Sequence, residues 1–109
     1  MATFHSSLPA IFAALSDPTR LGVVERLVSG PASISELAEP YSMAGPSFLK
    51  HMKVLESAGL VRSEKRGRIR MVRLQPDTLR WVEDWVRQHR GLWESRLDDL
   101  ATFLAQGDN

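Results

Sequence analysis

Apolar residues recur every three or four positions along the first 30 residues, which is the spacing of amphipathic helices. The first stretch starts behind Ser6 or Ser7 as the N-cap, with Pro9 in its first turn, and its apolar face consists of Leu8, Ile11, Phe12 and Leu15. The second starts behind Asp17 with Pro18 in the first helical position, and its predicted inner face consists of Leu21, Val24, Leu27 and Val28. A Gly-Pro pair ends it. The pattern therefore predicts two short helices in close succession.

Two further short helices are predicted to form a helix-turn-helix over residues 33–58. Ser33 and Glu36 have the spacing of a capping box, with Ser35 as an alternative cap, and Pro40 closes this helix after about two turns. Pro46 suits the first position of the next helix, whose apolar side consists of Phe48, Met52 and Leu55. The side chains away from that side are Ser47, Lys50 and Lys53. An apolar inner face and a basic outer face on the second helix are typical of this motif.

A basic β-hairpin is predicted over residues 60–75, where two runs of strand-forming residues flank the turn sequence RGR. Arg70 shares a strand face with Val72 and Leu74, so we expect either a bulge or a hairpin that loses its core contact at the tip. Five cations occur between residues 63 and 73, namely Lys65, Arg66, Arg68, Arg70 and Arg73. Beside a helix-turn-helix, such a tip favours a wing that follows a DNA backbone and reaches into the minor groove.

The last segment is predicted to be one long helix from about residue 77 to residue 105, about 40 Å in length. Its apolar stripe has a near-heptad rhythm with His89 in the one gap, and it consists of Leu79, Val82, Val86, Trp93, Leu97, Leu100 and Leu104, widened by Trp81, Trp85, Leu92 and Phe103. So wide an apolar stripe has to be buried on two sides. The rest of the chain can bury one side, and a second copy of the same helix can bury the other, which predicts an isologous dimer. A bend or an interruption is expected at Gly91.

Composition narrows the class of protein. The chain of 109 residues is 43% hydrophobic and 25% charged, which predicts one globular domain over residues 1–109. Residues 1–75 hold ten Lys and Arg against six Asp and Glu, whereas residues 76–109 hold four against seven, so the basic surface belongs to the first part. The absence of cysteine excludes disulfides and thiolate chemistry. The N-terminal sequence has neither a signal-peptide pattern nor a membrane span, and we expect a cytoplasmic protein.

Several runs in the chain resemble one family of regulators. These runs are FAALSDPTRLGVVERL, SISELAEPYSM, KHMKVLESAGLV, RGRIRMVRL and WESRLDDL. They resemble the ArsR-type winged helix-turn-helix repressors, particularly a branch with a tryptophan-rich last helix. The resemblance implies a mainly α fold with a small β-hairpin, and a homodimer joined by the first and last helices. It also implies that the fourth helix enters the major groove of double-stranded DNA and that the hairpin serves as the wing.

Carried over onto matching positions, the resemblance and the basic pattern give two sets of candidate residues. The expected DNA contacts are Ser47, Lys50, His51, Lys53, Arg66, Arg68 and Arg70. The expected dimer interface consists of Leu8, Ile11, Phe12, Trp85, Trp93, Leu97, Leu100 and Leu104.

Leu49 departs from the family pattern, because many members have a small polar residue at this position before the KHMKVL run. If Leu49 faces the groove, it can contact a thymine methyl group but cannot donate a hydrogen bond. Sequence preference there would then depend on apolar contact or on DNA shape. If Leu49 packs inward, the set of DNA contacts is smaller than the resemblance implies.

The ligand sets of the family's metal and thiol sensors are missing. Those sensors use a cysteine pair on the third helix or an Asp-x-His in the last helix, whereas here the third helix reads ELAEPYSM and Val86 stands two residues after Asp84. We therefore expect no metal and no cofactor, and the sequence names no effector. His89 is interpreted as a satisfied interface residue rather than as part of a metal or proton sensor with Asp84 and Glu94.

The other histidines and the tryptophans can each be interpreted as structural residues or as functional ones. His5 is expected to be a solvated residue near the N-terminus. His51 is equally well interpreted as a DNA contact and as a capping or packing residue. The three tryptophans are expected to fill the core or the dimer interface rather than to line an effector pocket.

Two classes of function remain. No Gly-rich phosphate loop, catalytic triad motif or spaced acid pair indicates an enzyme. The first class is a dimeric, sequence-specific DNA-binding repressor at an inverted repeat. The second is a winged-helix protein-interaction module that docks through Leu49 and the tryptophans. The salt dependence of the binding affinity distinguishes the two classes. Counterion release makes DNA binding weaken steeply as salt rises, whereas apolar docking to a protein does not weaken in this way.

Overall fold

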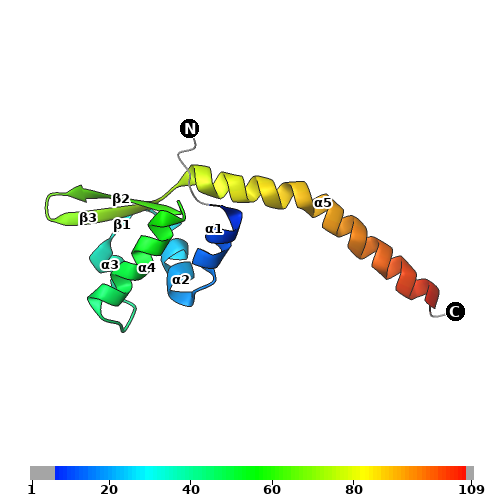
Figure 1. Ribbon diagram of the computed structural model, residues 1–109, viewed down its shortest axis with the longest axis horizontal. Coiled ribbons are helices and arrows are strands. Elements are labelled where there is room, and N and C mark those ends of the chain that lie inside the picture. The colour runs from blue at the N-terminus through cyan, green and yellow to red at the C-terminus, as the bar shows by residue number, and fades with distance from the viewer. Residues whose placement is uncertain (1–6, 108–109) are drawn as a thin grey trace. The chain divides into compact units, whose positions relative to one another are not determined.

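The computed structural model describes residues 7–107 of the chain, so the predictions for His5 and for Ser6 lie outside the described residues. The chain divides into two compact units, Met1–Thr78 and Leu79–Asn109. The elements follow one another as α1 (Leu8–Leu15), α2 (Pro18–Leu27), β1 (Ala32–Ser33), α3 (Ile34–Ala38), α4 (Gly45–Ser57), β2 (Val61–Arg66), β3 (Ile69–Leu74) and α5 (Pro76–Gly107) (Figure 1). The expectation of a mainly helical winged fold is confirmed.

The first two helices begin directly after Ser7 and Asp17, the N-cap residues expected from the sequence. The Ser7 hydroxyl accepts a hydrogen bond from the backbone N–H of Ala10, and a carboxylate oxygen of Asp17 accepts one from the N–H of Arg20. The inner face of α2 differs from the prediction, since its buried residues are Val23, Val24 and Leu27 while Leu21 and Val28 are exposed. Apolar residues cover more than one side of α2, and its packing against α4 and β3 selects the side that is buried.

The capping box of α3 is formed by Ser33 and not by Ser35. The Ser33 hydroxyl accepts from the N–H of Glu36, and the Glu36 carboxylate accepts from the N–H of Ser33. The hydrogen bond from the Ser33 N–H is the main reason why the pKa of the Glu36 carboxyl lies below its usual value. On α4, the predicted apolar side is confirmed, because the buried residues are Phe48, Met52 and Leu55. The ring of Tyr41 stacks on Phe48 with 6.0 Å between centroids.

The sheet has three strands in the order β1-β3-β2, one more than the predicted hairpin. Sequence patterns missed β1 because it is only two residues long, with Ala32 opposite Val72 of β3. The register of β2 and β3 runs without a bulge up to the pair Arg66 and Ile69, and Gly67 supplies the positive φ of +64° in the two-residue turn. The hairpin does lose its core contact at the tip, since Val72 is fully buried and Ile69 is 54% exposed.

Helices α2, α3 and α4 gather on one side of the sheet (Figure 1), and the core of the first unit lies between them. Its largest fully buried side chains include Ile11, Leu37, Phe48, Leu55, Leu60 and Val72. Thr78, in the first turn of α5, is also fully buried, and its hydroxyl donates a 2.6 Å hydrogen bond to the carbonyl oxygen of Gly59. This bond fixes the end of the first unit against the turn that follows α4.

The second unit is the remainder of α5. The helix continues through Gly91 without a break, so the expected interruption does not occur. Two i,i+4 ion pairs lie along it, Arg87 with Glu83 at 3.2 Å and Arg90 with Glu94 at 3.3 Å. Its large apolar side chains are exposed within the single chain: Trp81, Val86, Leu92, Trp93, Leu97, Leu100, Phe103 and Leu104. None of the helices in the described part of the chain is both long and apolar enough for a membrane span.

Candidate nucleic-acid interface

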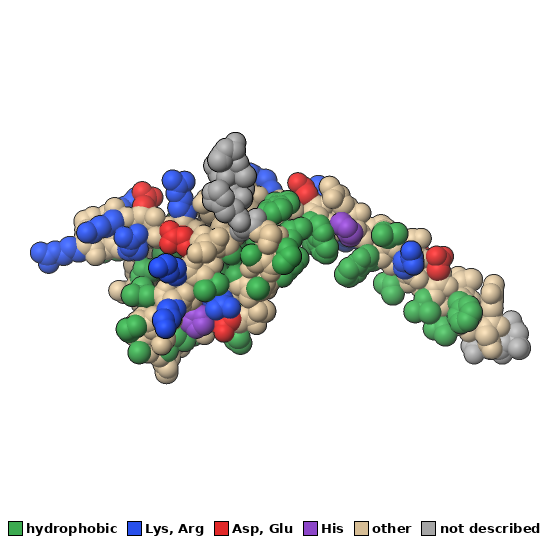
Figure 2. All heavy atoms as spheres, in the orientation of Figure 1, with side chains coloured by type: hydrophobic (Ala, Val, Ile, Leu, Met, Phe, Trp, Pro, Cys, Tyr) green, Lys and Arg blue, Asp and Glu red, His purple; other side chains and the backbone are tan. Residues whose placement is uncertain are grey.

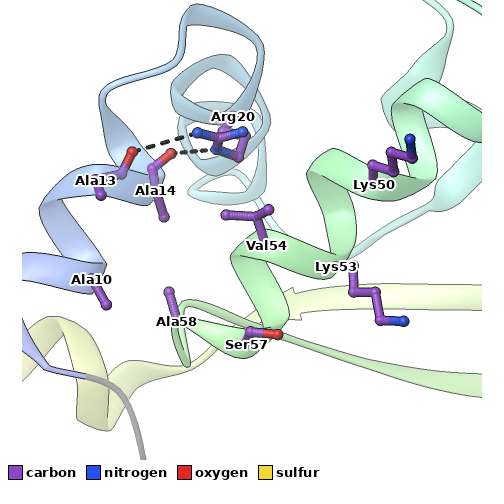
Figure 3. Close-up of a pocket in the computed structure, with 9 residues that line it drawn as sticks. All are labelled: Ala10, Ala13, Ala14, Arg20, Lys50, Lys53, Val54, Ser57 and Ala58. Carbon is purple, nitrogen blue, oxygen red and sulfur yellow. Dashed lines mark hydrogen bonds between the residues drawn. The ribbon is translucent and has the colours of Figure 1, made fainter.

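The outer side of α4 presents the polar side chains predicted from the sequence. Ser47, Lys50 and Lys53 are all exposed. Figure 3 shows that Lys50 and Lys53 extend from α4 away from α1, whereas Val54 points toward α1. Within residues 7–107, the two ammonium groups take part in no hydrogen bond or ion pair, so α4 offers two cations to an outside partner.

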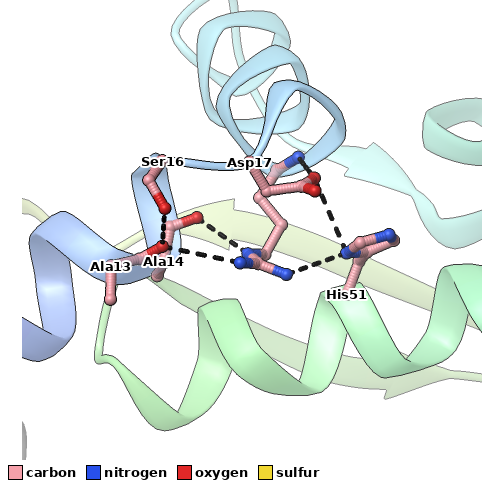
Figure 4. Close-up of polar contacts among 6 residues, drawn as sticks. Ala13, Ala14, Ser16, Asp17 and His51 are labelled. Carbon is pink, nitrogen blue, oxygen red and sulfur yellow. Dashed lines mark hydrogen bonds and ion pairs between the residues drawn. The ribbon is translucent and has the colours of Figure 1, made fainter.

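His51 lies against the start of α2 and its N-cap residue Asp17 (Figure 4). Its Nδ1 lies 3.0 Å from Nη1 of Arg20 and 3.7 Å from a carboxylate oxygen of Asp17. Arginine has no acceptor, so Nδ1 must accept this hydrogen bond and a neutral ring then carries its proton on Nε2. The structure therefore gives His51 a packing role through Nδ1, and a DNA contact through Nε2 stays a prediction.

Asp17 both caps the N-terminus of α2 and lies close to His51 of α4. Its carboxylate caps α2 through the N–H of Arg20, and this hydrogen bond is the main reason why the pKa of Asp17 lies below its usual value. Partial desolvation opposes this effect, and the nearby positive charge of Arg20 lowers the pKa further.

The three wing residues predicted from the sequence lie at or near the tip of the β2–β3 hairpin. Arg66 ends β2, with Nη2 3.7 Å from a carboxylate oxygen of Glu64, and this pair is exposed. Arg68 occupies the turn and is exposed. Arg70 donates a 3.1 Å hydrogen bond from Nη1 to the hydroxyl of Ser63, which directs it along the neighbouring strand. Figure 2 shows Lys and Arg side chains concentrated along this hairpin, with others over α4.

Two adjoining cavities bring the wing and α4 together. The first, about 390 Å³, is lined by residues at the start of α3, on α4 and at the start of β3: Ser33, Ile34, Ser35, Leu49, Arg68, Ile69 and Arg70. The second, about 440 Å³, shares Ile34, Leu49 and Arg70 with the first and extends along β2. Leu49 is 54% exposed, so of the two alternatives for this residue the outward-facing one is correct.

A larger, mostly apolar groove of about 610 Å³ lies between α4 and α1 (Figure 3). Its lining includes Ala10, Ala14, Val54 and Ala58, with the Arg20 guanidinium fixed at one end by the carbonyl oxygens of residues 13 and 14. Lys50 and Lys53 line it as well, so the cationic side of α4 borders this groove.

The predicted interface residues differ in their exposure. Ile11 departs from the prediction, because its side chain is fully buried inside the first unit and has no surface left for a partner. Leu8 and Trp85 are half-buried, and the remaining residues are exposed: Phe12, Trp93, Leu97, Leu100 and Leu104.

His89 is satisfied within its own helix. Its Nδ1 donates to the backbone carbonyl of Trp85 at 2.8 Å, and the two rings stack with 4.6 Å between centroids. In the described part of the chain, no group of three or more His, Asp or Glu side chains is placed to hold a metal ion.

Sequence reasoning missed two features of this surface. It assigned no role to Arg20, whose contact with His51 joins residues 31 positions apart, and no local pattern reports such a contact. It also did not connect Ile34 and Ile69 with Leu49, because their meeting depends on how α3, α4 and β3 pack.

A helix-turn-helix followed by a basic antiparallel hairpin defines a winged-helix DNA-binding protein. Comparison with known proteins agrees, since a family model for helix-turn-helix domains matches residues 15–64. The chain is 39% identical to the HTH-type transcriptional regulator Rv2034 of Mycobacterium tuberculosis over 110 residues, covering 100% of this chain and 99% of the relative. It is 24% identical to the transcriptional repressor SdpR of Bacillus subtilis over 91% of this chain and 94% of the relative.

Solved structures agree as well. The crystal structure of an ArsR family transcriptional regulator, RHA00566, superposes with a TM-score of 0.75 and 47% identity, covering 80% of this chain and 96% of that one. The chain belongs to the ArsR family of winged helix-turn-helix transcriptional regulators, which bind DNA.

Proposed function

We propose that this chain is a homodimeric repressor that binds an inverted-repeat operator in double-stranded DNA. The observation that carries the proposal is the joint placement of Leu49 on α4 and of Arg68 and Arg70 on the wing around one cavity. In this arrangement α4 enters a major groove, while the wing arginines follow the backbone toward the minor groove.

Phosphate contacts supply most of the affinity in this proposal. The contributing side chains are Lys50, Lys53, Arg66, Arg68 and Arg70, with Ser47 and Nε2 of His51 at or beside the groove. All five cations are exposed, and long flexible side chains of this kind bind phosphates without fixing a sequence.

The exposed apolar stripe of α5 supports the dimer. Large apolar side chains that repeat along an exposed helix are expected to be buried against a partner, and a second copy of the same helix is the simplest such partner. Residues 1–78 would then contact DNA and residues 79–109 would join the copies, so that the chain works as one winged-helix domain with a dimerisation helix. The proposed interface consists of Leu8, Phe12, Trp85, Trp93, Leu97, Leu100 and Leu104.

The names of relatives support repression rather than activation. Besides SdpR, the chain is 31% identical over 78 residues to the arsenical resistance operon repressor of Staphylococcus xylosus. A bound dimer that covers promoter DNA excludes the transcription machinery, and this action takes place in the cytoplasm, where a bacterial chromosome lies. The proposal names no effector and no metal.

The test measures binding of the purified protein to the DNA upstream of its own gene and to a scrambled duplex, at several salt concentrations. We expect tight binding to the upstream DNA, with weaker and steeply salt-dependent binding to the scrambled duplex. Equal and salt-insensitive binding to both duplexes, or no binding, would contradict the proposal and favour the protein-interaction module.

A further inference from the structure

Leu49 is an apolar residue on an otherwise polar side of α4. Scattered exposed leucines are ordinary on protein surfaces. This one is different, because Leu49 shares a cavity with two arginines of the wing, Arg68 and Arg70. It therefore stands within the cationic surface and not at its edge.

Two further apolar side chains line the same cavity. Ile34 comes from the start of α3 and Ile69 from the start of β3, so three elements contribute one apolar side chain each. Ile69 is 54% exposed, as Leu49 is, although a solvated hairpin tip gives no reason for an exposed isoleucine. The cations are Arg68 and Arg70, and the apolar cluster consists of Leu49, Ile34 and Ile69. This combination suits a partner whose surface carries negative charges next to a small apolar group.

Double-stranded DNA offers such a partner in the major groove. Phosphates line the groove, and the C5-methyl group of thymine is the only apolar group among the four unmodified bases there. A leucine cannot donate or accept a hydrogen bond, so contact with this methyl group is the direct way in which it can favour one base pair over another.

We propose that Leu49, supported by Ile34 and Ile69, reads the methyl group of a thymine in each half-site while Arg68 and Arg70 bind flanking phosphates. This inference rests on the proposed DNA-binding function and adds the chemistry by which the site selects a base. The shared chemistry is a C5-methyl group, which 5-methylcytosine also carries.

The experiment first selects duplexes from a random-sequence library with the wild-type protein. Each thymine of the selected site is then replaced, one at a time, by deoxyuridine, which lacks only the methyl group. At one position in each half-site we expect binding to weaken about fourfold, the value for burying one methyl group. Two further duplexes carry cytosine or 5-methylcytosine at that position in place of thymine. The methylated duplex should bind more tightly than the unmethylated one, and equal binding of the two would contradict reading of a C5-methyl group.

Leu49→Ala should abolish the difference between thymine and deoxyuridine at that position, whereas Leu49→Met should retain most of it. The matched control is Val54→Ala, which truncates another exposed apolar side chain of α4 on the side that faces α1. This control should leave the deoxyuridine penalty unchanged. Because Leu49 is half exposed, the variants should fold, and thermal unfolding verifies this.

The outcomes distinguish this inference from the proposed function. If specific, salt-dependent binding is found but no deoxyuridine position matters, or if Leu49→Ala keeps the penalty, the inference is wrong and the repressor proposal stands. If the selection yields no preferred sequence, both fail.

Discussion

Nη1 of Arg20 lies 3.0 Å from Nδ1 of His51, which joins the first turn of α2 to the middle of α4 (Figure 4). Nε of the same guanidinium donates to the carbonyl oxygen of Ala14 at the end of α1, over 2.8 Å. One arginine therefore connects three helices. This arginine junction is one of the contacts that hold α4 against α1 and α2.

His51→Ala should lower the free energy of unfolding by about 1 kcal/mol, because it removes the acceptor of a partly buried hydrogen bond from a charged donor. Urea unfolding followed by circular dichroism measures this change. Lys50→Ala, one residue earlier on the same helix, is the matched control and should leave the unfolding free energy unchanged while weakening DNA binding. Equal stability of His51→Ala and the wild type would show that the junction does not need this contact.

The charge of Asp17 should stabilise the fold above about pH 4. Its pKa is lowered in the folded chain, mainly by the hydrogen bond from the N–H of Arg20, so its contribution is present above the unfolded pKa and is lost as the pH falls through the folded pKa. Asp17→Asn keeps a capping oxygen and removes the charge. Thermal unfolding between pH 2 and 7 should therefore show a gap between wild type and variant that is largest near neutrality and closes at low pH. A gap that stays constant across this range would assign the effect to the cap and not to the charge.

Local signals in the sequence were sufficient for most of the fold. The starts of α1, α2 and α3 follow from Ser7, Asp17 and Ser33, whose side chains accept hydrogen bonds from the backbone only a few residues away. The hairpin turn follows from Gly67, which adopts the positive φ that other residues avoid. These interactions lie within a few positions of one another, so a pattern can report them.

Features that depend on packing were not predictable. The strand β1 is stabilised by pairing Ala32 with Val72, 40 positions later, and two residues carry no period of their own. The sequence leaves the direction of Leu49 open, since its residue type favours burial, whereas in the packed structure this side chain is exposed. The helical pattern predicts that Ile11 faces a partner, yet the same apolar character suits the core, where the structure buries it.

Arg68→Ala and Ser47→Ala should affect DNA binding in different ways. Arg68 occupies the exposed turn of the wing, so its loss should weaken binding to every sequence and reduce the slope of log K against log salt by about 2 for a dimer with one phosphate contact per wing. Ser47 has a hydroxyl near the start of α4, and its loss should change the preference among sites more than the overall affinity. Titrations of a specific and a scrambled duplex at four salt concentrations measure both quantities. An unchanged salt slope for Arg68→Ala would remove this residue from the phosphate contacts.

The apolar stripe of α5 should determine the oligomeric state. Leu97 and Leu100 are both exposed in the single chain, and placing a charge at either position would bury an unpaired carboxylate in the proposed interface. Leu97→Glu should therefore shift the protein from dimer to monomer at micromolar concentration, as measured by sedimentation equilibrium. It should also weaken binding to a two-half-site operator far more than binding to one half-site, since the two reading helices are no longer linked.

Glu94→Gln is the matched control for Leu97→Glu, because Glu94 lies one turn earlier and its exposed side chain pairs with Arg90 instead of belonging to the apolar stripe. Its removal should cost little, as exposed i,i+4 pairs contribute only a few tenths of a kcal/mol. If Leu97→Glu remained dimeric and bound the full operator like the wild type, the interface would lie on another surface. The exposed stripe would then require a different partner, and the spacing of the two reading helices could not be set by α5.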